Sequence, residues 1–123
     1  MAGSARKARE LSAVEDHPVL IMVTAGGRND AERIAEGLVE ARLAACCSVI
    51  PTVHSFYFWD GQLKREHEAL LLVKTVKSRA EAAQEYVRAN HTYELPEIIQ
   101  VAIEGGLPPY LEWLANQVAE APH

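Results

Sequence analysis

The segment from residue 46 to residue 75 constrains the fold more than any other part of the chain. Two runs rich in β-branched and aromatic residues, Cys46–Trp59 and Gln62–Thr75, flank an Asp60-Gly61 pair of the kind that favours a tight hairpin turn. At about 3.3 Å per residue each strand reaches roughly 45 Å, whereas a helix of ~15 residues covers roughly 22 Å. The sequence therefore predicts a hairpin that projects beyond the rest of a small domain.

The tip of this hairpin is aromatic on both of its faces. Alternation along the strand places Phe56 and Phe58 on one face and Tyr57 and Trp59 on the other. An isolated two-stranded ribbon is marginally stable in water, and exposed apolar patches commonly mark association surfaces. We therefore expect a homo-oligomer in which the hairpin packs against a neighbouring subunit. The alternative is that Pro51 bends the strand, so that the hairpin folds over its own sheet.

The two-residue turn also sets the pairing of the strands. It places His54 opposite His67 and, with no irregularity, Cys47 opposite Lys74. Pro51 cannot donate a ladder hydrogen bond, so a bulge at this residue is expected, and a bulge would shift the second pair. The two histidines are either a chelating pair for a divalent ion or a solvated pair without a ligand.

Hydrophobic periodicity predicts the remaining elements and a fold class. Strands are expected at 17–25, 46–59, 62–75 and 97–104, and helices at 29–39, 78–91 and 110–119. Asn29, with Glu32 three residues later, is expected to cap the first helix, and Ser78 the second. The order β-α-β-β-α-β-α predicts an α+β, ferredoxin-like split βαβ sandwich with two helices on one face of an antiparallel sheet. The other face of the sheet needs a partner.

Composition and charge limit the class of protein. The net charge of −5 argues against a nucleic-acid partner, and charged residues interrupt every apolar run, which argues against a membrane span. The two cysteines, Cys46 and Cys47, are adjacent and have no third partner, which argues against a disulfide framework and favours the cytoplasm. The length predicts a single domain at residues 17–120, preceded by a disordered tail at residues 1–16.

Five short motifs, taken in order, resemble one known family. They are ARLAAC, the Ile-Pro of SVIPTVHSFYFWDG, LLLVKT, HTYELPEII and PYLEWL. Together they resemble the CutA divalent-cation tolerance family, over residues from about Pro18 to Val118. The resemblance implies a tight homotrimer held together by the 46–75 hairpin, an architecture similar to that of PII signalling proteins, and an association with copper and other divalent metals.

The metal ligands that the resemblance implies are only partly present. Some members proposed to bind copper have a cysteine where this chain has Val23 and a His-His pair where it has Asn90 and His91, so His91 alone remains. Cu(II) generally needs several N, O or S ligands, so weak binding of Cu(II) or another divalent cation is expected. Further candidate ligands are the Glu97 carboxylate and the Cys46 thiolate, although Cys46 also suits the core.

A second candidate site combines charged and aromatic residues near the expected subunit boundary. Alternation turns the Glu97 carboxylate and the Lys74 ammonium toward apolar faces, where each needs a partner. We expect Lys74, Tyr93 and Glu97 to form one polar cluster, with Trp59 in the same inter-subunit cleft. The cluster either binds a small ligand or is an ion pair that fixes the register of the subunits.

Two functions from different classes follow from these expectations. The first is a homotrimeric, non-enzymatic protein of metal tolerance that needs no organic cofactor, because the sequence contains no recognisable set of catalytic residues. The second is a PII-like regulatory trimer that binds a small metabolite in the inter-subunit cleft and signals to a partner protein that the sequence does not identify.

Overall fold

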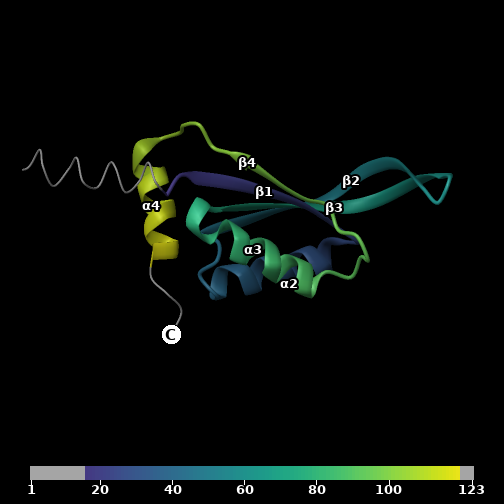
Figure 1. Cartoon of the computed structure of the whole chain (residues 1–123), viewed down its shortest axis with the longest axis horizontal. Helices are drawn as coiled ribbons and strands as arrows, with labels where there is room; N and C mark the ends of the chain where they lie inside the picture. Colours follow the sequence, from purple (N-terminus) through teal and green to yellow (C-terminus); the bar gives the residue numbers. More distant parts are fainter. Residues whose placement is uncertain (1–15, 120–123) are drawn as a thin grey trace, which may run out of the picture.

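The computed structural model describes residues 16–119, which form one four-stranded antiparallel sheet and three helices. Of the tail predicted at residues 1–16, Asp16 alone lies inside the described residues. The strands lie side by side in the order β2-β3-β1-β4 (Figure 1). In chain order the elements are β1 (Pro18–Ala25), α2 (Arg28–Glu40), β2 (Cys46–Trp59), β3 (Gln62–Val76), α3 (Lys77–Asn90), β4 (Ile98–Ala102) and α4 (Pro108–Ala119).

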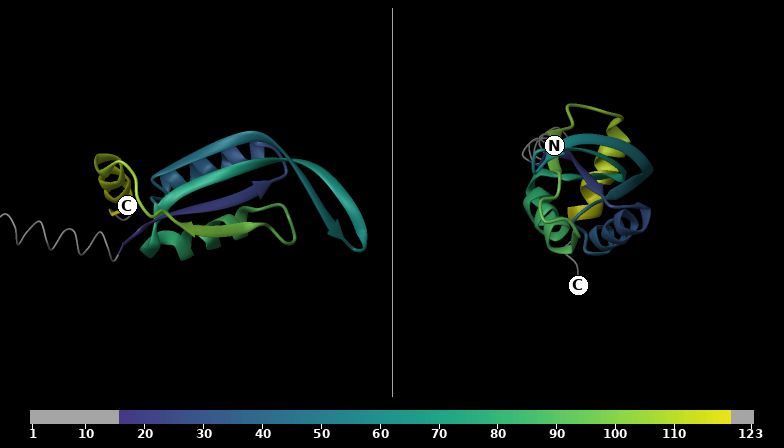
Figure 2. Two further views of the ribbon diagram at one scale, coloured as in Figure 1. Left: turned by 90° about the horizontal axis from the view of Figure 1, so that it is seen from above. Right: turned by 90° about the vertical axis from the view of Figure 1, so that its right-hand side faces the viewer.

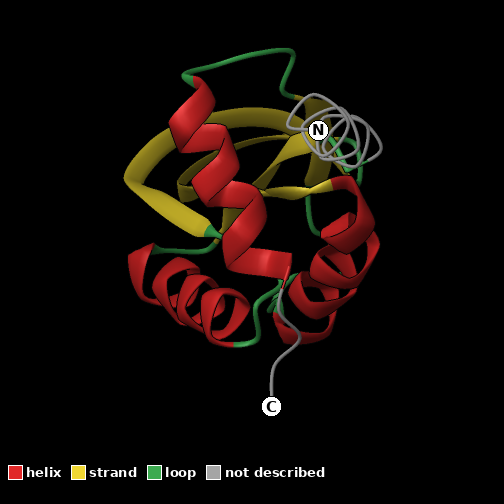
Figure 3. Ribbon diagram, turned by 90° about the vertical axis from the view of Figure 1, so that its left-hand side faces the viewer, coloured by secondary structure: helices red, strands yellow, loops and turns green. Residues whose placement is uncertain are grey.

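Two helices cover one face of the sheet, as the periodicity predicts. Figure 1 shows α2 and α3 beneath the strands, and Figure 3 shows α4 crossing one end of the sheet. The core lies between the sheet and the two covering helices, and its large buried members include Ile21, Ile34, Leu38, Leu71 and Val73. The ferredoxin-like α+β prediction is confirmed, because both helices use their apolar stripes to bury the same face of the sheet.

The hairpin has the predicted turn and the predicted bulge. Asp60 and Gly61 have φ values of 52° and 75°, the left-handed conformation that a tight hairpin turn requires. His54 pairs with His67, and the register shifts by one residue between Ile50 and Val53. On the side of the bulge away from the turn, Cys46 and not Cys47 lies opposite Lys74. Figure 2 shows the hairpin extending well beyond the helices and not folding back over the sheet.

The helix starts differ from the sequence prediction. The first turn of α2 begins at Gly27, whose carbonyl accepts the Ala31 N–H at 3.1 Å, so Asn29 lies inside the helix and caps nothing. At α3 the residue before the helix is Val76, and Ser78 donates both its backbone N–H and its hydroxyl to the Asp16 carboxylate. The Asp16 carboxylate, which precedes β1, therefore caps α3 in place of the Ser78 side chain, because it accepts a free backbone N–H of the first turn.

The face of the sheet opposite the helices is apolar and uncovered, and we call it the open face. Cross-strand pairing places Met22 between Leu72 and Ile99, and Leu20 between Lys74 and Val101. In the single chain Ile99 is 48% exposed and Val101 is 41% exposed. A soluble protein rarely leaves such a continuous apolar surface in contact with water. The apolar residues of the open face are Leu20, Met22, Ile50, Leu70, Leu72, Ile99 and Val101.

Close packing of the two covering helices predicts the effect of one substitution. Gly37 in α2 has no side chain where the Tyr86 hydroxyl of α3 approaches, so a Cβ at residue 37 would overlap the end of the tyrosine ring. We expect Gly37→Ala to lower the free energy of unfolding by about 1 kcal/mol, because a steric cost of about 1–3 kcal/mol exceeds the gain in helix propensity. Urea denaturation measures the change. Gly105→Ala, in the connection between β4 and α4 where a Cβ would also meet nothing within 4 Å, is the control.

Candidate functional site

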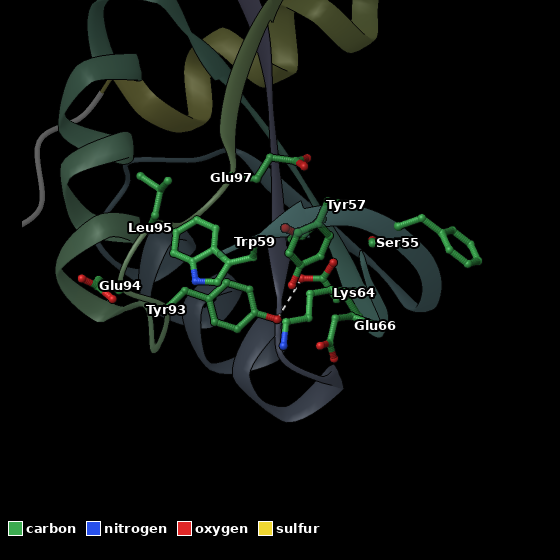
Figure 4. Close-up of a pocket in the computed structure, with 12 residues that line it drawn as sticks. Ser55, Tyr57, Trp59, Lys64, Glu66, Tyr93, Glu94, Leu95 and Glu97 are labelled. Atoms are coloured by element: carbon green, nitrogen blue, oxygen red, sulfur yellow. Dashed lines mark hydrogen bonds between the residues drawn. The ribbon is translucent and has the colours of Figure 1, made fainter. Parts of the chain in front are cut away.

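A cavity of about 630 Å³ lies where the hairpin leaves the sheet (Figure 4). It forms because the connection between α3 and β4 passes beside the base of the projecting hairpin, so that both segments contribute walls. The end of β1 adds Thr24. The lining residues are Thr24, Ser55, Phe56, Tyr57, Trp59, Lys64, Glu66, Glu68, Tyr93, Glu94, Leu95 and Glu97.

A hydrogen bond between Tyr93 and Glu68 joins the two walls of this cavity. The Tyr93 hydroxyl donates to Oε2 of Glu68 at 2.8 Å, and Glu68 is only 5% exposed (Figure 4). Loss of solvent, and then the neighbouring Glu68 carboxylate, raise the pKa of the Tyr93 hydroxyl above its ordinary value. Tyr93 therefore stays protonated at neutral pH and remains a donor to the buried carboxylate.

His91 anchors the connection that carries Tyr93. Its Nδ1 accepts the backbone N–H of Tyr93 at 3.0 Å, so Nε2 carries the ring proton and donates it to the carbonyl of Thr24 at 2.7 Å. Both ring nitrogens are therefore engaged within the chain. A metal ion at His91 would have to displace one of these hydrogen bonds, so the structure gives this residue a positioning role.

The structure brings together part of the predicted polar cluster. Trp59, Tyr93 and Glu97 line the same cavity, whereas the Lys74 ammonium donates to Ser48 Oγ at 2.8 Å and lies 3.8 Å from Cys46 Sγ. Lys74 pairs with Leu20, four residues along β1 from Thr24, which corresponds to about 13 Å. Lys74 therefore occupies the open face and not the cavity of its own chain.

Glu68 is the most deeply buried of the cavity residues that could not be assigned from the sequence. The sequence does indicate where this side chain points. Glu68 is an even number of residues from Lys74 along β3, as are Leu70 and Leu72, so strand alternation turns all of them to the same face of the sheet. Like Lys74, Glu68 is therefore a charged residue on an apolar face, where it needs a partner. The partner on the α3–β4 connection could not be read from periodicity.

The two cysteines point to opposite faces, as alternation predicts. Cys46 lies beside Lys74 on the open face, and Cys47 packs against the core. Burial, and then the neighbouring Cys46, raise the pKa of the Cys47 thiol from 9.0 to about 12, with Lys74 acting weakly in the opposite direction. Cys47 is therefore a protonated core residue at neutral pH and a poor metal ligand.

The raised pKa of Cys47 predicts a loss of stability at alkaline pH. Above pH 9 the unfolded chain releases the thiol proton while the folded chain keeps it, so the free energy of unfolding falls as the pH rises toward 12. We expect Cys47→Ala to reduce the slope of stability against pH in this range, as measured by urea denaturation at pH 8, 9 and 10. Cys46→Ala removes only the second cause of the raised pKa and leaves the burial of Cys47, so it should reduce the slope less than Cys47→Ala. An unchanged slope in Cys47→Ala would refute the assignment.

Among residues 16–119, no three histidine, cysteine or acidic side chains lie close enough to hold a metal ion together. The described helices are too short or too polar to span a bilayer.

Comparison with known proteins identifies the family of this fold and hairpin. A protein-family model described as "CutA1 divalent ion tolerance protein" matches residues 19–117. The chain belongs to this family. Among curated CutA proteins from plants and animals, the chain spans between 54% and 68% of their length.

Individual relatives in the family show the extent of the likeness. The CutA homolog of Xenopus laevis is 48% identical over 98 residues, which cover 80% of this chain and 65% of that protein. The divalent-cation tolerance protein CutA of Thermus thermophilus is 40% identical over 95 residues, which cover 77% of this chain and 92% of that one. The crystal structure of CutA1 from Oryza sativa superimposes with a TM-score of 0.82 at 37% identity, covering 85% of this chain and 96% of that one.

Proposed function

We propose that the protein is a homotrimer that binds divalent cations, among them Cu(II), and acts in metal tolerance without catalysing a reaction. The family to which the chain belongs is described by divalent ion tolerance and not by a reaction. The two cysteines are free thiols, which suit a reducing compartment, so we place the protein in the cytoplasm.

The single observation that carries the proposal is the pairing of an uncovered apolar sheet face with a projecting hairpin. Phe56, Phe58 and Leu63 near the hairpin tip are 64%, 73% and 51% exposed in the single chain. Three chains that exchange their hairpins would cover both these side chains and the open face, which removes apolar surface from water. Light scattering coupled to size exclusion is expected to give three times the 13.6 kDa of one chain. A stable mass of 13.6 kDa at micromolar concentration would contradict the proposed trimer.

Divalent-cation binding is tested by calorimetry on the full-length trimer. Titration with Cu(II), Zn(II) and Cd(II) is expected to give saturable binding. No binding tighter than about 1 mM for any of the three ions would contradict metal binding as the function. His91→Ala is a useful second sample, because both nitrogens of this ring are engaged within the chain and its loss should leave the affinity for metal unchanged.

The cavity supports a second candidate function, a PII-like regulatory trimer that binds a small metabolite and signals to a partner protein. Its volume of about 630 Å³ and its aromatic walls suit a small organic molecule. Four glutamates and one lysine line it, so a cationic metabolite fits the charge better than a nucleotide or an organic acid. A thermal-shift screen with amines, nucleotides and organic acids tests this candidate, because a ligand of the folded state raises the melting temperature.

A further inference from the structure

We propose that His54 and His67 form a two-imidazole site for a divalent transition-metal ion, Cu(II) or Zn(II), on the projecting hairpin. The inference rests on the proposed metal-binding function and gives it a location. The two residues are directly opposite each other in the β2–β3 ladder, and both are exposed. Their ring centroids lie 4.4 Å apart with an angle of 44° between the ring planes.

The geometry of this pair suits neighbouring positions on one metal ion. Imidazole nitrogens bind Zn(II) at about 2.0–2.1 Å, so two ligands at adjacent coordination positions lie about 3 Å apart. Ring nitrogens sit off the centroid, so a separation of 4.4 Å between centroids lets one nitrogen of each ring reach a common ion. No third histidine, cysteine or acidic residue among residues 16–119 completes a metal-binding group, so the remaining ligands come from water or from a neighbouring subunit.

The backbone holds both imidazoles in place before an ion arrives. The ladder is regular from Val53 to Trp59, so the pair belongs to a continuous, hydrogen-bonded register. The Asp60-Gly61 turn sets this register, and the bulge begins only beyond Val53, so the pairing of His54 with His67 is undisturbed. A pair fixed in this way loses less side-chain freedom on binding than two ligands on flexible loops.

The charges around the pair set the strength of the site. Arg65 occupies the next rung on the same face, with its guanidinium 6.0 Å from the centre of the Phe56 ring. The Arg65 charge repels a cation at the histidine pair. Glu66 and Glu68 point to the other side of the hairpin, where they line the cavity, so neither carboxylate can bind an ion held by the two histidines. The site is therefore expected to be weaker than one with a carboxylate ligand. Arg65→Gln should bind the metal more tightly than the wild type.

The histidine pair is also better suited to a metal ion than His91 or Cys47. The ring nitrogens of His91 already bind Thr24 and Tyr93 within the chain, and burial keeps the Cys47 thiol protonated. Imidazole is a ligand that Cu(II), Zn(II) and Ni(II) share, which fits a family described by tolerance to divalent ions in general.

Calorimetry with Cu(II) and Zn(II) on the full chain tests the site. His54→Ala and His67→Ala are each expected to weaken binding by about tenfold or more, because a single imidazole then remains. His17→Ala removes an exposed imidazole at the far end of the sheet and should leave the affinity unchanged. Wild-type affinity in His54→Ala/His67→Ala would overturn the histidine site while metal binding elsewhere stands. A wild-type protein that binds neither ion would overturn both this site and the proposed function.

A relocation variant and a spectrum separate chelation from a general effect of histidine content. The double variant His54→Ala/Gln62→His keeps two imidazoles in the hairpin but places the second about 16 Å along β3 from His67, too far for both to hold one ion, so it should bind as weakly as His54→Ala. Electron paramagnetic resonance of the Cu(II)-loaded wild type is expected to show coupling to two imidazole nitrogens. Coupling to none, or undiminished binding by the relocation variant, would contradict the site.

Discussion

Replacing Ile99 by aspartate is expected to convert the proposed trimer into a folded monomer. Ile99 lies on the open face of β4, where it is 48% exposed in the single chain, so the substitution should leave the core of the chain intact. In the trimer the same residue is expected to be covered by a neighbouring subunit. An unpaired carboxylate buried there is expected to cost several kcal/mol at each of the three contacts of the proposed trimer.

Gln100→Asp is the matched control for this substitution. Gln100 is the next residue of β4 and points the other way, toward α3, where its side chain accepts a hydrogen bond from Gln84 at 2.7 Å. The control adds the same charge to the same edge strand, but on the face that lies outside the proposed subunit interface. Light scattering should report a monomer for Ile99→Asp and a trimer for Gln100→Asp. Trimers in both variants would show that the open face is not the interface.

Removing the Tyr93 hydroxyl is expected to give the largest loss of stability among substitutions in the cavity. Tyr93→Phe leaves the Glu68 carboxylate, which is 5% exposed, without the donor that now binds it at 2.8 Å. Hydrogen bonds to charged groups contribute about 1.5–3 kcal/mol, and an unsatisfied buried charge adds to the loss. We therefore expect the free energy of unfolding to fall by about 2–3 kcal/mol in urea denaturation.

Two further variants identify the cause of this loss. Tyr57 lines the same cavity and is 40% exposed, so Tyr57→Phe should change the stability by less than about 0.5 kcal/mol. Replacing both partners, in Tyr93→Phe/Glu68→Met, should recover part of the stability, because no buried charge is then left unpaired. Equal losses in Tyr93→Phe and Tyr57→Phe would contradict the assigned role of the hydrogen bond.

The hairpin was predictable from the sequence because local rules determine it. Asp60-Gly61 specifies the turn, the turn specifies the pairing of His54 with His67, and Pro51 marks the bulge. The same rules gave the order of the elements and hence the ferredoxin-like fold. Periodicity also showed that one face of the sheet would need a partner, since two helices can cover only the other face.

Contacts between distant segments could not be predicted in this way. Asp16 binds the first turn of α3, 62 residues later, and so replaces the cap that local sequence assigns to Ser78. His91 was a candidate metal ligand, but the loop folds so that Thr24 and the backbone of Tyr93 engage its ring. Lys74 was expected to meet Tyr93 and Glu97 at a subunit boundary; within one chain it lies beside Ser48, and the inter-subunit cluster stays a prediction. From the sequence one can tell that these polar side chains need hydrogen-bond partners, but the partners come from distant segments that periodicity does not place.

Native mass spectrometry of the full-length protein during titration with Cu(II) tests the central claim most directly, because it reads the number of chains and the number of bound ions in one spectrum. The account predicts a trimer, three times the 13.6 kDa of the chain, that takes up one ion per chain and loses this uptake in His54→Ala/His67→Ala. A monomer, or a trimer that acquires no ions at micromolar Cu(II), would contradict it.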